Sequence, residues 1–367
     1  MIDYTARRTV IREHMARRGI DLLAVWPSEN MTYLLGWHSH PDERPCFFLL
    51  TPRGEAMLMP ELNAEEARAH LNVSMETYAD AEGPAEALRR LGAQLHFGDV
   101  DVVALDETMR TDFSLLLLEH LDDARPLAAT ELIGGVRMLK EDVEVELIQQ
   151  NAATADRAMQ AAFASIRPGV SERDIGQAAR QAYEEAGVDK VNFTIIGAGP
   201  NGAFPHHATS RKRVEEGDAI VIDIGARKDG YNSDVTRMAF VGTPSQHYLE
   251  VHAVVEQAVQ AALGVIRPGL AAREVDRAAR DVITAAGYGE YFVHRTGHGL
   301  GLNGHEPPYI TSTNELALEK GMVFSVEPGI YLPGEFGVRL EEIVVVTEDG
   351  ARIFNGLPRE VFVAEAR

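Results

Sequence analysis

The chain has 367 residues, with 35 basic and 56 acidic side chains and a formal net charge of −21. Its length fits two domains of ordinary size, and its 45% of apolar and 25% of charged residues are typical of a packed globular protein, which excludes wholesale disorder. Because the acidic balance repels phosphate backbones and anionic lipid headgroups, we expect no nucleic-acid partner and no membrane partner.

The N-terminal residues predict a charged helix over 4–18 and lack the apolar core of a signal peptide. No apolar run approaches the roughly 18 residues that a membrane span needs. The single cysteine, Cys46, excludes an internal disulfide and a thiolate-rich metal site. These features predict a cytoplasmic protein.

The first third of the chain alternates short apolar runs with helix-like segments, which is typical of an α/β domain. Buried strands are predicted at 22–26, 46–51, 55–60 and 100–106, and helices at 63–72 and 110–121. We place this N-terminal domain at residues 1–130. A long amphipathic helix is then predicted to begin at Met138 and to stop before Pro168–Gly169, and it opens a second domain at 138–367.

The second domain contains an internal repeat. Residues 161–187 align without gaps to residues 261–287, at an offset of 100, and their IRPG turns and closing glycines coincide. Further on, residues 215–225 match residues 319–329. Two similar amphipathic helices would not account for the matching turns and strands. We therefore expect an α+β domain with an internal pseudo-two-fold repeat, each half supplying two helices and then strands.

Two aspartates lie in the strands of the first half. The segment 221–240 predicts a hairpin around an Asp229–Gly230 turn, which places Asp223 and Asp234 near-opposite on one face. A carboxylate inside so apolar a run is costly unless it meets a cation or several donors. Either aspartate alone would be interpreted as a hydrogen-bonded structural residue.

The repeat changes this interpretation. Glu327 follows a glycine by six residues, as Asp223 does, and so occupies the equivalent strand position. Its expected partner strand, 337–346, offers Glu341 and Glu342, and strand alternation does not choose between them. Four buried carboxylates around one axis need compensation, and oxygen-rich sites of this kind bind divalent cations. A pair of bridged metal ions is an arrangement used for hydrolysis.

Three histidines accompany the carboxylates. His298 lies in the segment TGHGLGLNGHEPP, where glycines leave the imidazole free to approach an ion. His206 and His305 fall at nearly equivalent places in the two halves. Each of these two alone could be an ordinary loop histidine. Together, beside a carboxylate cluster, they favour a role as proton donors or carbonyl polarisers.

At this point the chain resembles a known family. The motifs GAFPHH, VIDIG, SDVTR, RTGHGLG, GHEPP, SVEPGIY and GVRLEE, in this order, resemble those of the metal-dependent Xaa-Pro peptidases, prolidase and aminopeptidase P. The resemblance is strong over the C-terminal two-thirds and looser over the N-terminal domain. It implies a creatinase-like α/β N-terminal domain followed by a catalytic domain with the pita-bread fold.

The resemblance also implies site residues. It selects Glu341 over Glu342 and gives a dinuclear ligand set in which Asp234 and Glu341 bridge the ions: Asp223, Asp234, His298, Glu327 and Glu341. Manganese is the first expectation for the two ions, with cobalt or zinc as alternatives.

The remaining roles also follow from the resemblance. Glu327 would transfer a proton, and His206 and His305 would contact the substrate and stabilise the tetrahedral intermediate. Arg339 would steady the metal-binding carboxylates, and its alternative is an exposed strand arginine.

The activity implied is hydrolysis of the Xaa-Pro bond at the N-terminus of dipeptides or short peptides, and a prolidase is favoured. One alternative is an aminopeptidase P that acts on longer peptides, and another is a catalytically inactive peptide-binding module. A lyase or another amide hydrolase on the same scaffold also stays open. The N-terminal domain disfavours methionine aminopeptidase, and the retained ligands disfavour creatinase-like hydrolases.

One position departs from the dipeptidase pattern. Family dipeptidases commonly carry an arginine four residues after the second histidine, and Tyr309 stands there in this chain. In relatives, the corresponding N-terminal loop, here 36–46, can reach a catalytic pocket, sometimes across a dimer. Arg44 in this loop is the candidate for binding the substrate carboxylate, and in that case we expect a prolidase that is a homodimer. The alternative is a solvated arginine beside Asp42 and Glu43.

Overall fold

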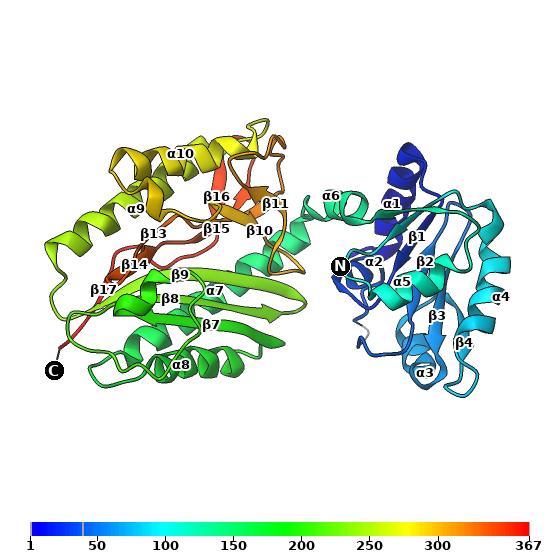
Figure 1. Ribbon diagram of the computed structural model, residues 1–367, viewed down its shortest axis with the longest axis horizontal. Coiled ribbons are helices and arrows are strands. Elements are labelled where there is room, and N and C mark those ends of the chain that lie inside the picture. The colour runs from blue at the N-terminus through cyan, green and yellow to red at the C-terminus, as the bar shows by residue number, and fades with distance from the viewer. Residues whose placement is uncertain (1, 39, 367) are drawn as a thin grey trace. The chain divides into compact units, whose positions relative to one another are not determined.

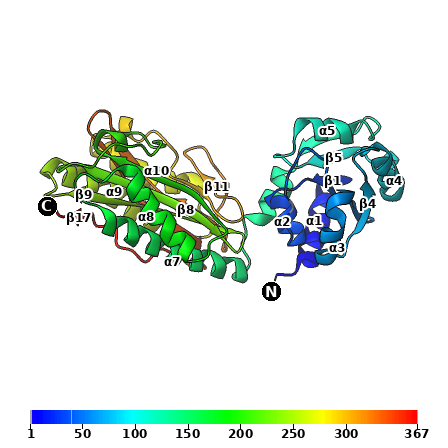
Figure 2. The ribbon, with the colours of Figure 1, turned by 90° about the horizontal axis from the view of Figure 1, so that it is seen from below.

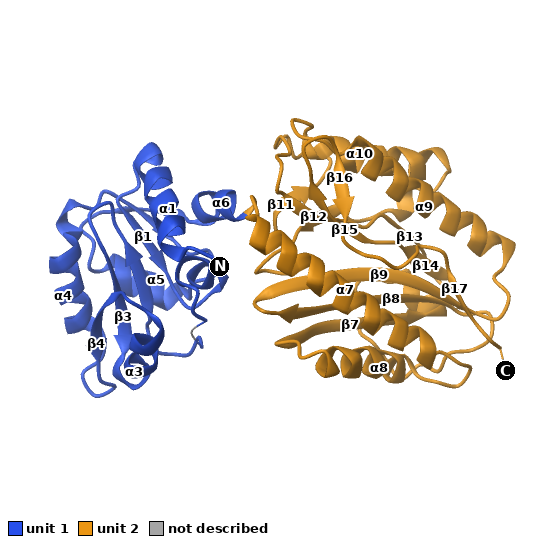
Figure 3. Ribbon diagram, turned by 180° about the vertical axis from the view of Figure 1, so that it is seen from behind, with its two compact units in different colours: residues 1–137 blue, residues 138–367 orange. Residues whose placement is uncertain are grey.

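The computed structural model describes residues 2–38 and 40–366 and divides into two compact units, 1–137 and 138–367 (Figure 3). Each unit has its own sheet and its own apolar core. Within the described residues, every helix is too short or too polar to cross a membrane.

The first unit is built on one six-stranded sheet in the order β4-β3-β2-β1-β5-β6. Its strands are β1 (Leu22–Val25), β2 (Phe47–Leu50), β3 (Glu55–Pro60), β4 (Ser74–Tyr78), β5 (Val102–Leu105) and β6 (Arg125–Ala128). Strand β2 is antiparallel to both its neighbours, and the other pairs are parallel. Phe47, Leu88, Val103 and Leu117 belong to its buried core.

Helices cover this sheet. They are α1 (Tyr4–Arg18), α2 (Glu29–Leu35), α3 (Glu61–His70), α4 (Ala85–Leu95), α5 (Thr111–Leu118) and α6 (Gly135–Arg137), with the short segments η1 (Phe97–Asp99) and η2 (Thr130–Gly134). Helix α1 has the predicted bounds because Asp3 caps its first amides and Gly19, at φ 62°, ends it in the left-handed conformation.

The second unit shows the predicted duplication in its helices. Helices α7 (Asp142–Ser165) and α8 (Glu172–Glu185) are repeated as α9 (Gln246–Val265) and α10 (Ala272–Ala285). The turns between them contain Gly169 at φ 86° and Gly269 at φ 83°, a conformation that glycine adopts without strain. Helices α7 and α9 end, and α8 and α10 begin, at positions 100 residues apart, so the same turn is used twice.

Helix α7 begins later than predicted, at Asp142 rather than at Met138. Leu139 forms a bridge to Met322, and the amide of Lys140 donates to the carbonyl oxygen of Gly321. Glu141 then caps the helix. The segment before Asp142 is therefore extended, because it pairs with the C-terminal half of the unit.

Three sheets lie between the two helix pairs (Figure 1). The four-stranded sheet is β17-β9-β8-β7, the five-stranded sheet is β11-β10-β12-β15-β16, and β13 and β14 form a two-stranded ribbon. The strands are β7 (Lys190–Ala198), β8 (Ala219–Lys228), β9 (Tyr231–Val241), β10 (Gly297–Gly299), β11 (Glu306–Ile310), β12 (Val323–Val326), β13 (Gly329–Leu332), β14 (Phe336–Arg339), β15 (Glu342–Val346), β16 (Ala351–Ile353) and β17 (Phe362–Ala364), and the short helical segments are η3 (Gly199–Ala203) and η4 (Gly289–Tyr291).

Each helix pair packs on the strands of its own half. Helices α7 and α8 lie along the four-stranded sheet (Figure 2), where Tyr183 and Ile222 are part of the core. Helices α9 and α10 pack against the remaining strands, where Val255 and Phe324 belong to a second core. The strands of the two halves therefore meet in the middle of the unit.

The strand predicted over 337–346 is interrupted at Leu340–Glu341, and its partner is interrupted at Glu327–Pro328. Strand β12 pairs with β15 on one side of the break, and β13 pairs with β14 on the other. The same register runs through both pairs, so Glu327 and Glu341 occupy facing positions in the gap. The chain changes sheets at the two glutamates.

Candidate metal centre

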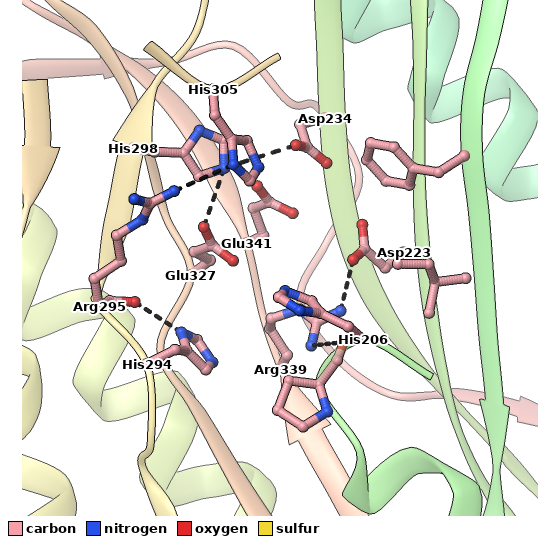
Figure 4. Close-up of a pocket in the computed structure, with 13 residues that line it drawn as sticks. His206, Asp223, Asp234, His294, Arg295, His298, His305, Glu327, Arg339 and Glu341 are labelled. Carbon is pink, nitrogen blue, oxygen red and sulfur yellow. Dashed lines mark hydrogen bonds and ion pairs between the residues drawn. The ribbon is translucent and has the colours of Figure 1, made fainter. Parts of the chain in front are cut away.

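A cavity of about 570 Å³ lies where the two halves meet (Figure 4). This volume suits a small ligand. Its lining residues are Phe193, Ile195, Pro205, His206, Asp223, Asp234, His294, Arg295, His298, His305, Glu327, Arg339 and Glu341. The structure thus brings together all the site residues singled out in the second domain.

The hairpin of β8 and β9 supplies two of the carboxylates. Asp223 lies opposite Thr236, and Asp234 lies opposite Gly225, so the two aspartates are diagonal neighbours on one face. Both are buried, with exposed fractions of 9% and 5%. The sequence predicted that the two aspartates lie near-opposite on one face. The shared face is observed, but the register set by the two-residue turn places Asp234 opposite Gly225, two residues along the strand from Asp223.

The second half supplies two glutamates and a histidine. Nε2 of His298 lies 3.3 Å from Oε1 of Glu327 and 3.9 Å from Oδ2 of Asp234. Potential ligand atoms of His298, Glu327 and Glu341 lie within 4.8 Å of one another, as do those of Asp223, Asp234 and Glu341. Glu341 belongs to both groups and therefore joins them into one cluster.

Glu342, the alternative to Glu341, is engaged elsewhere. Its Oε1 accepts from Arg237 at 2.9 Å and from Arg359 at 3.0 Å. Because neighbouring strand residues point to opposite faces, Glu342 turns away from the cavity that Glu341 lines. The two arginines compensate its charge.

The sequence suggested that the glycines around His298 leave room for its imidazole to approach an ion, but the structure gives them a role in strand packing. A Cβ on Gly297 would lie 1.8 Å from the carbonyl oxygen of Ser325, and a Cβ on Gly299 would lie 2.3 Å from that of Pro307. The glycines therefore let β10 fit between its neighbours. Nδ1 of His298 then lies 3.0 Å from the carbonyl oxygen of Gly299, which orients Nε2 towards the carboxylates. Burial lowers the pKa of His298 to about 4, so the ring is neutral at pH 7.

The carboxylates are incompletely satisfied by the protein. Among the described residues, Oδ1 of Asp223, Oδ1 of Asp234 and Oε1 of Glu341 are buried without a hydrogen-bond partner. Burial and the neighbouring anions raise the pKa of Asp234 and of Glu341 well above the usual range, and burial also raises the pKa of Glu327. Unpaired oxygens from three carboxylates beside a neutral imidazole are the donor set of a divalent-cation site. The residues present therefore fit metal ions.

Arg339 connects these carboxylates from behind. Its Nη2 donates to Oδ2 of Asp223 at 2.6 Å and its Nε to Oγ1 of Thr236 at 3.2 Å. Thr236 in turn donates to Oε2 of Glu341 at 2.8 Å. Arg339 is 3% exposed, so the alternative of an exposed strand arginine is wrong.

The other two histidines lie on opposite walls of the cavity. The ring of His305 is 3.8 Å from the ring of His298, between centroids, and its Nδ1 lies 3.2 Å from Nη2 of Arg295. His206 follows Pro205, whose carbonyl oxygen accepts from Arg339 at 3.4 Å (Figure 4). Loss of solvent and nearby positive groups lower the pKa of His305 to about 4, so this ring is also neutral at pH 7.

Sequence reasoning missed two polar residues of the cavity. His294 lies between the carbonyl oxygen of Arg295, at 2.7 Å, and the hydroxyl of Tyr331, at 2.8 Å. Arg295 is the first residue of the RTGHGLG motif. Its position in the sequence, three residues before the proposed ligand His298, is the signal that could have pointed to it.

Arg44 belongs to the first unit and is occupied there. Its Nε and Nη2 donate to the two carboxylate oxygens of Asp80 at 2.8 and 2.9 Å. Its Nη1 contacts Asp42 and Glu43, as the alternative interpretation expected. A role of Arg44 in binding substrate stays a sequence-based prediction.

Comparison with known proteins assigns the chain to a family. Residues 146–348 match the family described as Metallopeptidase family M24, and residues 7–139 match the Creatinase/Prolidase N-terminal domain. The chain belongs to metallopeptidase family M24. The expected fold, a creatinase-type α/β domain followed by a pita-bread domain, is confirmed.

Relatives and solved structures match nearly the whole chain. The Xaa-Pro dipeptidase of Lactobacillus helveticus is 37% identical over 346 residues, which cover 92% of this chain and 93% of that protein. The crystal structure of dipeptidase PepE from Mycobacterium ulcerans has a TM-score of 0.93 at 36% identity and covers 99% of this chain and 98% of its own. The prolidase from Thermococcus sibiricus has a TM-score of 0.94 at 32% identity, with coverage of 99% and 100%.

Proposed function

We propose that this M24 chain is an Xaa-Pro dipeptidase, a hydrolase that cleaves the peptide bond before a C-terminal proline. The observation that carries the proposal is the cavity in which unpaired oxygens of Asp223, Asp234 and Glu341 meet a neutral His298. End-to-end similarity to proteins named Xaa-Pro dipeptidase and prolidase supports the same substrate class.

The proposed metal ligands are the five residues expected from the sequence: Asp223, Asp234, His298, Glu327 and Glu341. Two divalent cations held there would act as Lewis acids and would make water available as a nucleophile at neutral pH. Manganese is our first choice, because carboxylate-rich sites suit it, and cobalt or zinc are alternatives. Arg339 would orient Asp223 and, through Thr236, Glu341.

Glu327 is the proposed proton carrier. Its Oε1 accepts from the hydroxyl of Ser325 at 3.0 Å, and its carboxylate lies at the edge of the cluster, beside His298. Burial raises its pKa, which suits a group that takes a proton from water and passes it to the departing proline nitrogen.

His305 and His206 are the proposed donors to the substrate. Because Arg295 donates to Nδ1 of His305, the proton of that neutral ring is on Nε2. Nε2 can then donate to the carbonyl oxygen of the scissile bond as negative charge develops on it. His206, on the opposite wall, is available to contact the same substrate.

The test compares an Xaa-Pro dipeptide with an Xaa-Pro-Xaa tripeptide, each assayed with the purified protein after reconstitution with Mn²⁺. Metal-dependent cleavage of the dipeptide is expected. Preference for the tripeptide would instead favour an aminopeptidase P, and binding without cleavage of either would favour the inactive module. We also propose a homodimer, which sedimentation equilibrium would test.

A further inference from the structure

The cavity contains a cation that makes no direct contact with the substrate in the proposed reaction. Two of the described residues lining the cavity are arginines, Arg339 and Arg295. Arg339 is committed, because it donates to Asp223, Thr236 and the hydroxyl of Tyr331. Arg295 is different: within the described residues it forms no ion pair with a carboxylate. A charged guanidinium therefore borders the cavity without an ion-pair partner in the described part of the chain.

Two aromatic rings hold Arg295 in place. Its guanidinium carbon lies 4.6 Å from the centroid of the Tyr309 ring, a cation–π contact. Its Nη2 lies 3.2 Å from Nδ1 of His305. Tyr309 is paired with His298 in the register of β10 and β11, so its backbone is fixed by the strand that carries a proposed metal ligand. The stack and the hydrogen bond together orient the guanidinium before a substrate arrives.

This orientation suits a carboxylate. An arginine has five donors in a planar fork, and Arg295 uses one nitrogen for His305, which leaves others available for a bidentate contact. A dipeptide differs from a longer peptide by the carboxylate on its second residue. Of the two arginines that line the cavity among the described residues, Arg339 is already paired with Asp223, so Arg295 is the guanidinium left to receive that carboxylate.

We propose that Arg295, supported by the ring of Tyr309, binds the C-terminal carboxylate of the dipeptide and so makes the site selective for dipeptides. This inference rests on the proposed function, whose substrate it specifies. Tyr309 then acts as a positioning residue, since it supplies the surface on which the guanidinium rests. This assignment explains why a tyrosine at position 309 can replace the arginine that is common in dipeptidases, because Arg295 of the RTGHGLG motif supplies the positive charge instead.

Arg295 is favoured over Arg44 by its surroundings. Asp80 holds Arg44 through two hydrogen bonds, and Asp42 and Glu43 contact the same guanidinium. Binding a substrate would require Arg44 to leave these acids. Arg295 forms no such ion pair with any of the residues that the structure describes.

The experiment uses the Mn²⁺-reconstituted full chain and measures kcat/KM for an Xaa-Pro dipeptide and for its C-terminal amide, which lacks only the carboxylate charge. The ratio of kcat/KM for the dipeptide to kcat/KM for the amide reports recognition of the carboxylate. In Arg295→Ala the ratio should fall about 10- to 100-fold, the range for loss of a charge-assisted hydrogen bond. Most of that fall should come from a higher KM for the dipeptide. In the double variant Arg295→Ala/Tyr309→Arg the ratio should recover.

The matched control is Arg352→Ala, which removes an arginine of β16 outside the cavity lining. The guanidinium carbon of Arg352 lies 5.2 Å from the centroid of the Phe354 ring, so this arginine also rests on an aromatic ring. Its ratio should equal that of the unmodified protein. If Arg295→Ala is too inactive to assay, Arg295→Lys is measured instead, and its ratio should fall because the fork is lost.

An unchanged ratio in the Arg295 variants would overturn the assignment and leave the proposed function intact. A fall in Arg44→Ala alone would move the assignment to Arg44. If the unmodified protein cleaves neither substrate, both the proposed function and this inference fail.

Discussion

Arg339 donates from Nη2 to Oδ2 of Asp223 over 2.6 Å, while Oδ1 of the same carboxylate has no partner among the described residues. The arginine therefore fixes one oxygen and leaves the other directed at the cluster. A side chain that is not itself a proposed metal ligand would in this way decide how a metal ligand is presented.

Substitution of Arg339 should weaken metal binding and folding together. Arg339→Ala leaves Asp223 without its cation, and loss of one partner of a buried pair costs about 3–5 kcal/mol. Metal affinity should fall by about 10- to 100-fold, the usual effect of removing a group that orients a ligand. Calorimetric titration with Mn²⁺ and thermal unfolding measure the two effects. The metal affinity and the melting temperature of Arg339→Lys should lie between those of Arg339→Ala and the native protein. Native metal affinity in Arg339→Ala would contradict the orienting role.

Substitution of a proposed ligand should remove turnover and spare the fold. In Asp223→Asn and Glu341→Gln the side chains keep their shape and lose the charge that the metal ions require. We expect hydrolysis to drop below detection, with metal content reduced and circular dichroism unchanged. Full activity of metal-depleted Asp223→Asn would refute the dinuclear mechanism.

In the metal-free protein, replacing the charged Glu341 by a neutral glutamine should raise the stability of the fold. The pKa of Glu341 is raised in the folded state, chiefly by burial, so ionised Glu341 destabilises the fold at neutral pH. In chelator at pH 7.5, Glu341→Gln should melt at a higher temperature than the native protein. The difference should shrink as the pH falls through the raised pKa, because native Glu341 then takes up a proton and becomes neutral. Melting curves from pH 8 to pH 5 check this, and a difference that grows on acidification would have the wrong sign.

Activity should fall in acid because protons compete with metal for the carboxylates. Burial holds the pKa of His298 at about 4, well below the ordinary histidine value of about 6.5. The groups that gain protons first are therefore Asp234 and Glu341, whose pKa values are raised. Raising the Mn²⁺ concentration should move the acid limb of kcat/KM to lower pH. A limb that ignores metal concentration would point to a group outside the cluster.

The sequence predicted the strands and helices whose pattern is strongly periodic. Helix α1 was predicted with its observed bounds, since Asp3 and Gly19 mark both ends. The predicted buried strands contain β1, β2, β3 and β5. Strand β4 was not predicted, because SMETY at the sheet edge is polar and only partly buried. Helix α7 was started too early, because the bridge of Leu139 to Met322 is a contact over a long sequence distance.

The site was predictable to the extent that it repeats. The duplication placed Glu327 beside Asp223 without any knowledge of the fold. The facing positions of Glu327 and Glu341 were not predictable, since they depend on a chain that changes sheets in mid-strand. Arg295 was missed because its contacts with Tyr309 and His305 come from tertiary packing.

The extended segment that precedes α7 is part of the catalytic unit. Nζ of Lys140 lies 2.5 Å from Oε1 of Glu306, the residue after His305, and the two side chains are 1% and 5% exposed. An excised catalytic domain that began at the first residue of α7 would lack this lysine and would bury a glutamate without its cation, at a cost of about 3–5 kcal/mol. The useful cut for a stand-alone catalytic fragment therefore lies before Leu139. The three residues 139–141, which a helix-based boundary would discard, decide whether the fragment keeps the ion pair next to His305.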